Sequence, residues 1–209
     1  MFPLLTLNPT KMKKILLDNG HGIDTPGKRS PDGVLREYTY NREIARAIYE
    51  HLTLRGIDAE LIVPEEADIP LYERCRRINS KALINGIADT FAISIHVNAA
   101  GNGSEWMNAT GWCAYTFPGR SQADKLADFL YKAAKRHLPG QRLRTDYSDG
   151  DPDFEKPFYI LKHTYCPVVL TENMFMDALP DYRFLLSDEG KRAIVNLHVD
   201  GICEFLRSL

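Results

Sequence analysis

Four side chains in this chain of 209 residues are of the types that bind metal ions or move protons. His21 follows a short apolar run at 15–17, His96 follows a second run at 91–95, and Glu172 follows a third at 167–171. Apolar runs of this length are typical of buried strands, and α/β sheets collect functional side chains where such strands end. The fourth, Glu37, comes directly after a long stretch rich in glycine and proline. We therefore expect the four side chains to converge on one cleft.

Two histidines and one glutamate form a donor set typical of an open zinc site. Catalytic zinc usually has three protein ligands and one position left for water, whereas structural zinc is closed by four, usually with cysteine. Zinc lowers the pKa of its water to about 7, and a further carboxylate then carries the water's proton to the leaving amine. Glu172 is the candidate for that base, because a carboxylate that ends an apolar strand is costly unless it faces a metal or a partner.

Each of these residues also has a simpler interpretation when it is taken alone. A single histidine after a strand is commonly a hydrogen-bonded structural residue, and Glu37 could be a favourable charge in the first turn of a helix. Glu172 could belong to a buried ion pair. The joint placement of the four residues is what favours a catalytic site.

The pattern of apolar residues predicts strands that alternate with helices. The expected strands lie near 15–17, 57–63, 91–96, 110–117, 158–161 and 168–172, and the expected helices over 37–55, 70–85, 121–138 and from 187 to near the end of the chain. Residues 141–157 are expected to form a loop. This alternation predicts one α/β domain, with a mostly parallel twisted sheet of about six strands and helices on both faces. We expect that domain over 13–209, after an N-terminal extension over 1–12.

Charge and composition exclude several partners. The formal net charge is -2, without the clustered positive charge that nucleic acid or anionic lipid requires. No apolar run is long enough to span a bilayer, and the first residues lack the basic start and apolar stretch of a secretory signal. The four cysteines contain no C-x-x-C pair, so we expect buried thiols rather than disulfides or a structural zinc module. We expect a monomer.

Five segments together resemble one known family, the zinc-dependent N-acetylmuramoyl-L-alanine amidases that degrade bacterial peptidoglycan. The carrying segments are 17–22 with the nearby Pro26 and Gly27, then Glu37 with Asn41 and Ala45, then 71–74 with Asn79, then 94–99, and finally 169–175. The resemblance covers roughly residues 13–206. Two departures stand out: Met174 lies where relatives tend to carry glycine, and Asp177 and Ala178 lie where they tend to carry serine and asparagine.

The resemblance implies both a site and a reaction. It assigns one zinc ion to His21, Glu37 and His96, and catalysis to Glu172. It implies a six-stranded sheet and cleavage of the amide between the lactyl group of N-acetylmuramic acid and the L-alanine of the stem peptide. Its partners would be the glycan and stem peptide of the bacterial cell wall, reached by an export or lysis route that the sequence does not identify.

Two other functions stay open at this point. An equivalent site could serve a zinc carboxypeptidase or deacylase that acts on another amide, and the domain could be a wall-binding module without activity. The loop residues Arg142 and Arg144, with the acidic residues between 146 and 155, could contact the stem peptide or simply face solvent. Trp106 and Trp112 could stack on sugar, although Trp112 lies in an expected strand and is better interpreted as core. Arg74 is expected to pair with a carboxylate beneath the site.

Overall fold

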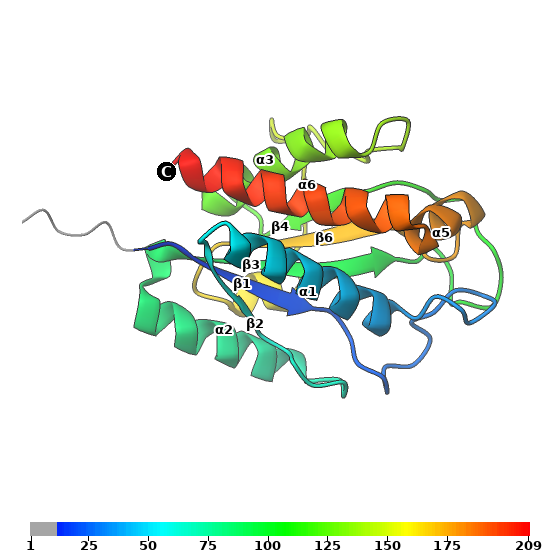
Figure 1. Ribbon diagram of the computed structural model, residues 1–209, viewed down its shortest axis with the longest axis horizontal. Coiled ribbons are helices and arrows are strands. Elements are labelled where there is room, and N and C mark those ends of the chain that lie inside the picture. The colour runs from blue at the N-terminus through cyan, green and yellow to red at the C-terminus, as the bar shows by residue number, and fades with distance from the viewer. Residues whose placement is uncertain (1–11) are drawn as a thin grey trace, which may run out of the picture.

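The computed structural model describes residues 12–209, and its centre is a six-stranded sheet (Figure 1). The strands are β1 (Lys14–Asn19), β2 (Asp58–Leu61), β3 (Thr90–Asn98), β4 (Cys113–Thr116), β5 (Phe154–Glu155) and β6 (Val168–Phe175), in the spatial order β2-β1-β3-β6-β4-β5. The first four strands in this order run parallel, β4 runs antiparallel to β6, and β5 runs parallel to β4. The parallel strands β1, β3 and β6 therefore end at one edge of the sheet.

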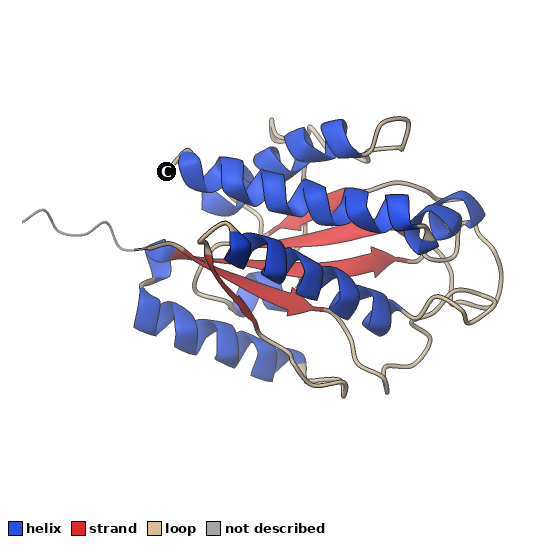
Figure 2. Ribbon diagram, viewed as in Figure 1, coloured by secondary structure: helices blue, strands red, loops and turns tan. Residues whose placement is uncertain are grey.

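Helices cover both faces of the sheet, and the expected fold is confirmed (Figure 2). The helices are α1 (Glu37–Leu54), α2 (Leu71–Asn85), α3 (Gln122–His137), α4 (Tyr159–His163), α5 (Leu179–Leu186) and α6 (Asp188–Arg207), with a short 3₁₀ turn at Ile87–Asp89. α1, α3 and α6 pack on one face, and α2 and α4 on the other. Ser121 and Ser187 accept backbone N–H bonds at the starts of α3 and α6, as their side-chain type predicts.

The sheet has a buried core on each face because its central strands are apolar on both sides. Ile15 and Leu17 of β1 point into the larger core, whereas Leu16 between them belongs to the smaller core beneath α2 and α4. Parallel strands buried on both faces read as continuous apolar runs, which is why these strands were recognisable from the sequence. All four cysteines are free and buried, as expected.

Three parts of the expected element order are wrong. Of residues 158–161, expected as a strand, Phe158 is the cap residue before α4 and 159–161 lie in α4, where Ile160 and Leu161 pack against α2. A short apolar run does not distinguish a buried strand from a turn of buried helix. The sixth strand is instead β5, inside the stretch expected to be a loop, and α5 was not expected at all.

Within residues 12–209, no helix combines the length and apolarity that crossing a bilayer would require. The N-terminal extension expected over 1–12 lies almost entirely outside the described residues.

Candidate active site

The four residues singled out by the sequence come to one edge of the sheet. His21 lies two residues beyond the end of β1, Glu37 is the first residue of α1, and His96 lies near the end of β3. Glu172 of β6 is the direct register partner of His96, so both side chains stand on the same face of two adjacent strands. The topology explains this convergence, because β1, β3 and β6 are parallel neighbours.

His21, Glu37 and His96 have the geometry of a metal-binding group. One donor atom from each residue lies within 4.8 Å of the others. The His21 Nε2 to Glu37 Oε2 distance is 3.4 Å, and the His96 Nδ1 to Glu37 Oε1 distance is 3.2 Å. Two ligands of one tetrahedral zinc ion at about 2.0–2.1 Å are separated by roughly 3.3–3.4 Å. The donor set therefore fits zinc in its chemistry, and the donors lie close enough together to share one ion.

The Glu37 carboxylate is held in place on one oxygen and left open on the other. Its Oε1 accepts the Val97 backbone N–H at 3.0 Å and faces the Asn41 side chain at 3.5 Å. Its Oε2 is buried without a hydrogen-bond partner, and the residue is only 1% exposed. A buried carboxylate oxygen without a donor is costly, and a metal ion would satisfy it.

The two histidines are placed by unusual backbone. A Cβ on Gly20 would lie 2.1 Å from Cε1 of His96, so only glycine leaves room for that imidazole. His21 adopts a left-handed conformation with φ 64°, which turns its side chain toward the site. The two rings lie edge to face at 4.9 Å between centroids. Burial lowers the pKa of His21 to about 4, which keeps its ring neutral and able to bind a metal.

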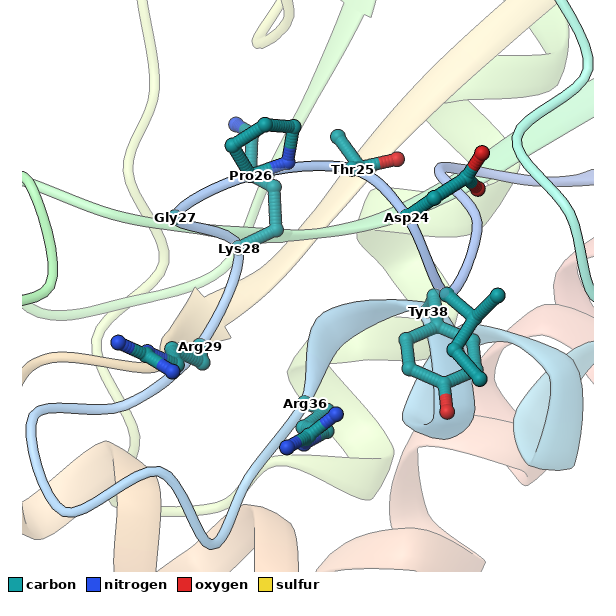
Figure 3. A pocket seen from close by; sticks show the side chains of 9 residues that line it. Asp24, Thr25, Pro26, Gly27, Lys28, Arg29, Arg36 and Tyr38 are labelled. Atoms are coloured by element: carbon teal, nitrogen blue, oxygen red, sulfur yellow. The ribbon is translucent and has the colours of Figure 1, made fainter.

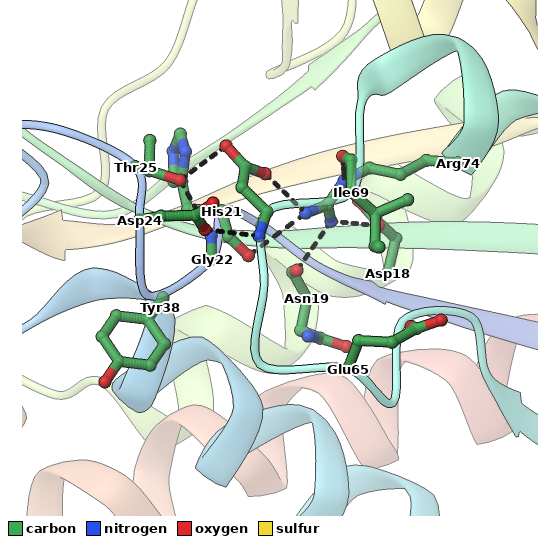
Figure 4. A network of polar contacts seen from close by, with 12 residues as sticks. Asp18, Asn19, His21, Gly22, Asp24, Thr25, Tyr38, Glu65, Ile69 and Arg74 are labelled. Carbon is green, nitrogen blue, oxygen red and sulfur yellow. Dashed lines mark hydrogen bonds and ion pairs between the residues drawn. The ribbon is translucent and has the colours of Figure 1, made fainter.

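A buried guanidinium fixes the loop that carries His21 (Figure 4). Arg74 of α2 is 2% exposed and donates to Asp18 Oδ1 at 2.8 Å, to the Asn19 carbonyl at 2.8 Å and to the His21 carbonyl at 3.1 Å. Arg42 of α1 also donates to the His21 carbonyl, at 3.0 Å. The pairing expected for Arg74 is present, and it ties helices on both faces of the sheet to one loop.

Glu172 lies beside the metal-binding group with the properties of a proton carrier. It is partly buried, and its Oε2 has no hydrogen-bond partner. Burial raises the pKa of Glu172 to about 7, and the negative charge of Glu37 adds to the effect. A carboxyl group with a pKa near neutral can both accept and return a proton.

A bulge in β6 follows Glu172 and accounts for one departure from the amidase pattern. His96 pairs with Glu172 but Asn98 pairs with Phe175, so one extra residue lies in β6. Met174, in this bulge, has φ 67°, a conformation that favours glycine. Asn173 accepts from the Trp112 indole at 2.9 Å and donates to the His96 carbonyl at 2.9 Å. Trp112 is therefore a buried core residue that supports β3, as its place in a strand suggested.

The second departure, Asp177, holds a loop beside the site. Its carboxylate accepts the backbone N–H groups of Ala100 at 2.9 Å and of Gly101 at 2.7 Å. The loop after β3 is thus fastened to the end of β6. Trp106 of this loop packs against Tyr182, at 5.0 Å between ring centroids.

Two hollows flank the metal-binding group. One, of about 280 Å³, is lined by both histidines together with Gly20, Arg74 and other residues of the loops before α2. The other, of about 240 Å³, is formed by the loop before α1 and is rich in cations, with Lys28, Arg29 and Arg36 (Figure 3). Within residues 12–209, none of these three side chains has an ion-pair partner. Sequence reasoning did not single out this basic pocket, although three cations around Glu37 were a visible signal.

The loop residue Arg144 is held by rings near the end of the site. Its guanidinium lies 5.1 Å from the centre of the Phe175 ring and 5.6 Å from that of Phe154, and it donates to Cys113 Sγ at 3.7 Å. Arg144 is thus part of the packing at the start of β4. The suggestion that Arg142, Arg144 and the acidic residues nearby contact a peptide stays a prediction.

Comparison with known proteins identifies the family. The model of the N-acetylmuramoyl-L-alanine amidase family, Amidase_3, matches residues 15–204. The chain is 28% identical over 197 residues to an endolysin of Bacillus phage SPP1, which covers 93% of this chain and 66% of that protein. It is also 28% identical over 193 residues to a sporulation-specific N-acetylmuramoyl-L-alanine amidase of Bacillus subtilis, covering 91% of this chain and 67% of that protein. The chain thus spans about two thirds of the length of these relatives.

Solved structures agree on the fold. An N-acetylmuramoyl-L-alanine amidase from Clostridium difficile 630 superimposes with a TM-score of 0.77 at 20% identity, covering 95% of this chain and 99% of that one. The catalytic domain of CwlV, an amidase from Bacillus (Paenibacillus) polymyxa, gives a TM-score of 0.76 at 21% identity, covering 94% and 99%. The predicted family, α/β fold and enzyme class are confirmed. The chain therefore belongs to the N-acetylmuramoyl-L-alanine amidase family of peptidoglycan hydrolases.

Proposed function

We propose that this domain hydrolyses the amide between N-acetylmuramic acid and L-alanine at a single zinc ion held by His21, Glu37 and His96, with Glu172 as the proton carrier. The observation that carries the proposal is the orphaned, buried Oε2 of Glu37, which faces Nε2 of His21 at 3.4 Å beside the second histidine. The mixed nitrogen and oxygen donors are those of catalytic zinc, which would polarise the scissile carbonyl and activate water.

The chain's own residues supply the proton transfers. In the first half of the reaction the Glu172 carboxylate takes a proton from water as the water oxygen bonds to the amide carbon. In the second half the protonated Glu172 gives that proton to the amide nitrogen as the carbon–nitrogen bond breaks. The products are a carboxylic acid on the lactyl group, which releases the second water proton as it ionises, and a free amine on L-alanine. Burial raises the pKa of Glu172, and a carboxyl group that holds its proton more tightly than usual is suited to take the proton from water and to return it to the amide nitrogen.

The basic pocket fits the peptide side of this substrate. Lys28, Arg29 and Arg36 are cations without ion-pair partners in the described part of the chain, and they line a hollow directly before Glu37. One carboxylate, Asp24, also lines the hollow, so the charge of the hollow remains positive overall and favours an anionic ligand. Carboxylates of the stem peptide are the ligands of that kind that an amidase substrate offers. We place the stem peptide over this pocket and its L-alanine at the metal-binding group.

Digestion of purified muropeptides, followed by mass spectrometry with and without a zinc chelator, tests the reaction. The expected products are intact glycan fragments and peptides with a new L-alanine amine, and the chelator should abolish both. Release of residues from the peptide's C-terminus would favour a carboxypeptidase and overturn the proposed cleavage. The site of action follows from the substrate, which is the bacterial cell wall.

A further inference from the structure

A second group of metal-binding side chains lies at the other end of the sheet. Asp124 in the first turn of α3 meets Asp151 and Asp153 of the segment before β5, with one carboxylate oxygen from each within 4.8 Å of the others. β4 runs antiparallel to β6, and its first residue, Cys113, pairs with Glu172. Its last residue, Thr116, binds Asp153 and lies three residues away, or roughly 10 Å along the strand. This aspartate cluster is therefore separate from the zinc site.

The three carboxylates lack any compensating positive charge. None of them forms an ion pair with a lysine, arginine or histidine of the described chain. Asp153 is 1% exposed, and Oδ1 of Asp153 and Oδ1 of Asp151 are both buried without a hydrogen-bond partner. An unpaired buried carboxylate is among the most costly groups a protein can contain. Something that carries positive charge must accompany these oxygens.

One oxygen of Asp153 and one oxygen of Asp124 are held by hydrogen bonds. Thr116 Oγ1 donates to Asp153 Oδ2 at 2.6 Å, and the Ser121 backbone N–H donates to Asp124 Oδ2 in the cap of α3. These bonds leave Oδ1 of Asp153 and Oδ1 of Asp124 for a ligand. Two of the three side chains are thus held in place, and the buried Oδ1 of Asp153 stays without a partner.

We propose that Asp124, Asp151 and Asp153 bind one hard divalent cation, with calcium as the best-fitting ion, and that this ion clamps the segment before β5 to β4 and α3. Calcium takes only oxygen ligands, at about 2.3–2.6 Å, so two of its ligands lie no more than about 5 Å apart. The cluster meets that limit and offers no nitrogen or sulfur donor, which distinguishes it from the zinc site. Magnesium fits less well, because it seldom takes more than one or two protein carboxylates.

The competing explanation is a proton shared between two carboxyl groups. Burial, together with the neighbouring carboxylates of Asp151 and Asp124, raises the pKa of Asp153 to about 8, so a metal-free cluster holds a proton near neutral pH. A divalent ion replaces that proton and satisfies all three carboxylates, whereas a proton satisfies two. The two explanations predict opposite responses to calcium and to Asp153→Asn.

The test uses the zinc-loaded full chain at pH 7.5, dialysed against calcium-free buffer and titrated with calcium chloride. Isothermal titration calorimetry should give one calcium ion per chain. Calcium at about 100 times its Kd should raise Tm by roughly 5–10 °C.

Asp153→Asn and Asp124→Asn should each lose the calcium binding and the shift in Tm. The amide oxygen introduced by Asp124→Asn can still accept the α3 cap bond, so this variant is the one expected to fold more readily. The matched control is Asp149→Asn, an exposed position in the same segment, which should respond as wild type does.

Three outcomes would overturn the proposal. The first is the absence of calcium binding up to 10 mM, a concentration we choose as the limit of a specific site. The second is undiminished binding in Asp124→Asn and Asp153→Asn. The third is a calcium-independent rise in the Tm of Asp153→Asn above wild type, which would identify a shared proton. All three readouts are independent of amidase activity, so failure here leaves the proposed reaction untouched.

Discussion

The two ends of the sheet hold two groups of side chains with the spacing of metal ligands, and the groups differ in donors, exposure and surroundings. At one edge, two histidines and a glutamate face a hollow of about 280 Å³, and Glu172 stands beside them with a pKa near neutral. At the other end, three aspartates meet between a helix start and a strand end, and Oδ1 of Asp151 and Oδ1 of Asp153 are buried without a hydrogen-bond partner. Donor type and access to a substrate-sized space, rather than the mere presence of acidic residues, distinguish the proposed catalytic centre from the proposed structural site.

Removal of a proposed zinc ligand should abolish metal binding at one end of the sheet only. In His96→Ala, bound zinc should fall from near one per chain to a small fraction, and activity on muropeptides should disappear, because two remaining ligands hold zinc poorly. Elemental analysis after dialysis measures the zinc, and calorimetry measures calcium, which should bind as before. His163→Ala, at the end of α4, is the matched control. Retention of full zinc and activity in His96→Ala would refute the proposed ligand set.

Replacement of the proton carrier should separate chemistry from metal binding. Glu172→Gln keeps the size of the side chain but cannot take a proton, so we expect turnover to fall roughly 10²–10⁴-fold. Zinc content and Tm should stay close to wild type, because Glu172 is not one of the three ligands. A variant that lost its zinc together with its activity would show that Glu172 binds the metal and that the roles have been assigned wrongly.

Removal of two cations from the basic pocket should affect activity less than the loss of a zinc ligand or of Glu172. The double change Arg29→Ala with Arg36→Ala should raise KM roughly 2–10-fold and leave kcat nearly unchanged, because partly exposed ion pairs contribute modestly to binding. Arg46→Ala, which removes an exposed cation farther along α1, is the control for overall charge. The effect should vanish on muropeptides whose carboxylates have been amidated. If KM were unchanged with native substrate, the stem peptide would lie elsewhere.

The stability of the calcium-free protein should depend on pH through Asp153 of the aspartate cluster. The folded-state pKa of Asp153 is about 8, above its ordinary value of 3.8, so the calcium-free folded protein holds a proton that the unfolded chain releases. Stability should therefore be greatest below about pH 4 for this group and should be lost progressively as pH rises to about 8. The Tm of calcium-free wild type, relative to Asp153→Asn, should fall by a few degrees over this window. Excess calcium at pH 8 should raise the Tm of wild type above that of Asp153→Asn. A difference between the two Tm values that does not change with pH would contradict the raised pKa.

Much of this architecture followed from the sequence because it depends on local patterns. The runs that end near His21, His96 and Glu172 are apolar on both faces, so they identified central parallel strands whose ends had to meet. The Arg74 pairing was predictable for a different local reason: a charge on the inner side of a helix needs a counter-charge. Roles at the site, in contrast, still depend on the experiments above.

Other features depend on tertiary contacts that no local pattern encodes. A helix, α4, forms where a strand was expected, and a strand, β5, forms where a loop was expected. Packing of Ile160 and Leu161 beneath the sheet decides between two structures of similar local propensity. The left-handed Met174 follows from the pairing register of β6 with β3. Asp151 and Asp153 were expected in a loop whose acidic residues could contact the stem peptide or face solvent, because their approach to Asp124 of α3 joins segments that are distant in the sequence.

The Arg74 guanidinium joins two backbone carbonyls of the His21 loop to a helix that packs on the far side of the sheet. Alignment of the metal-binding imidazole therefore depends on how well α2 is seated, even though α2 contributes no ligand. Substitutions that disrupt the core beneath α2, for instance at Ile78, should weaken zinc retention at temperatures well below those at which the domain unfolds.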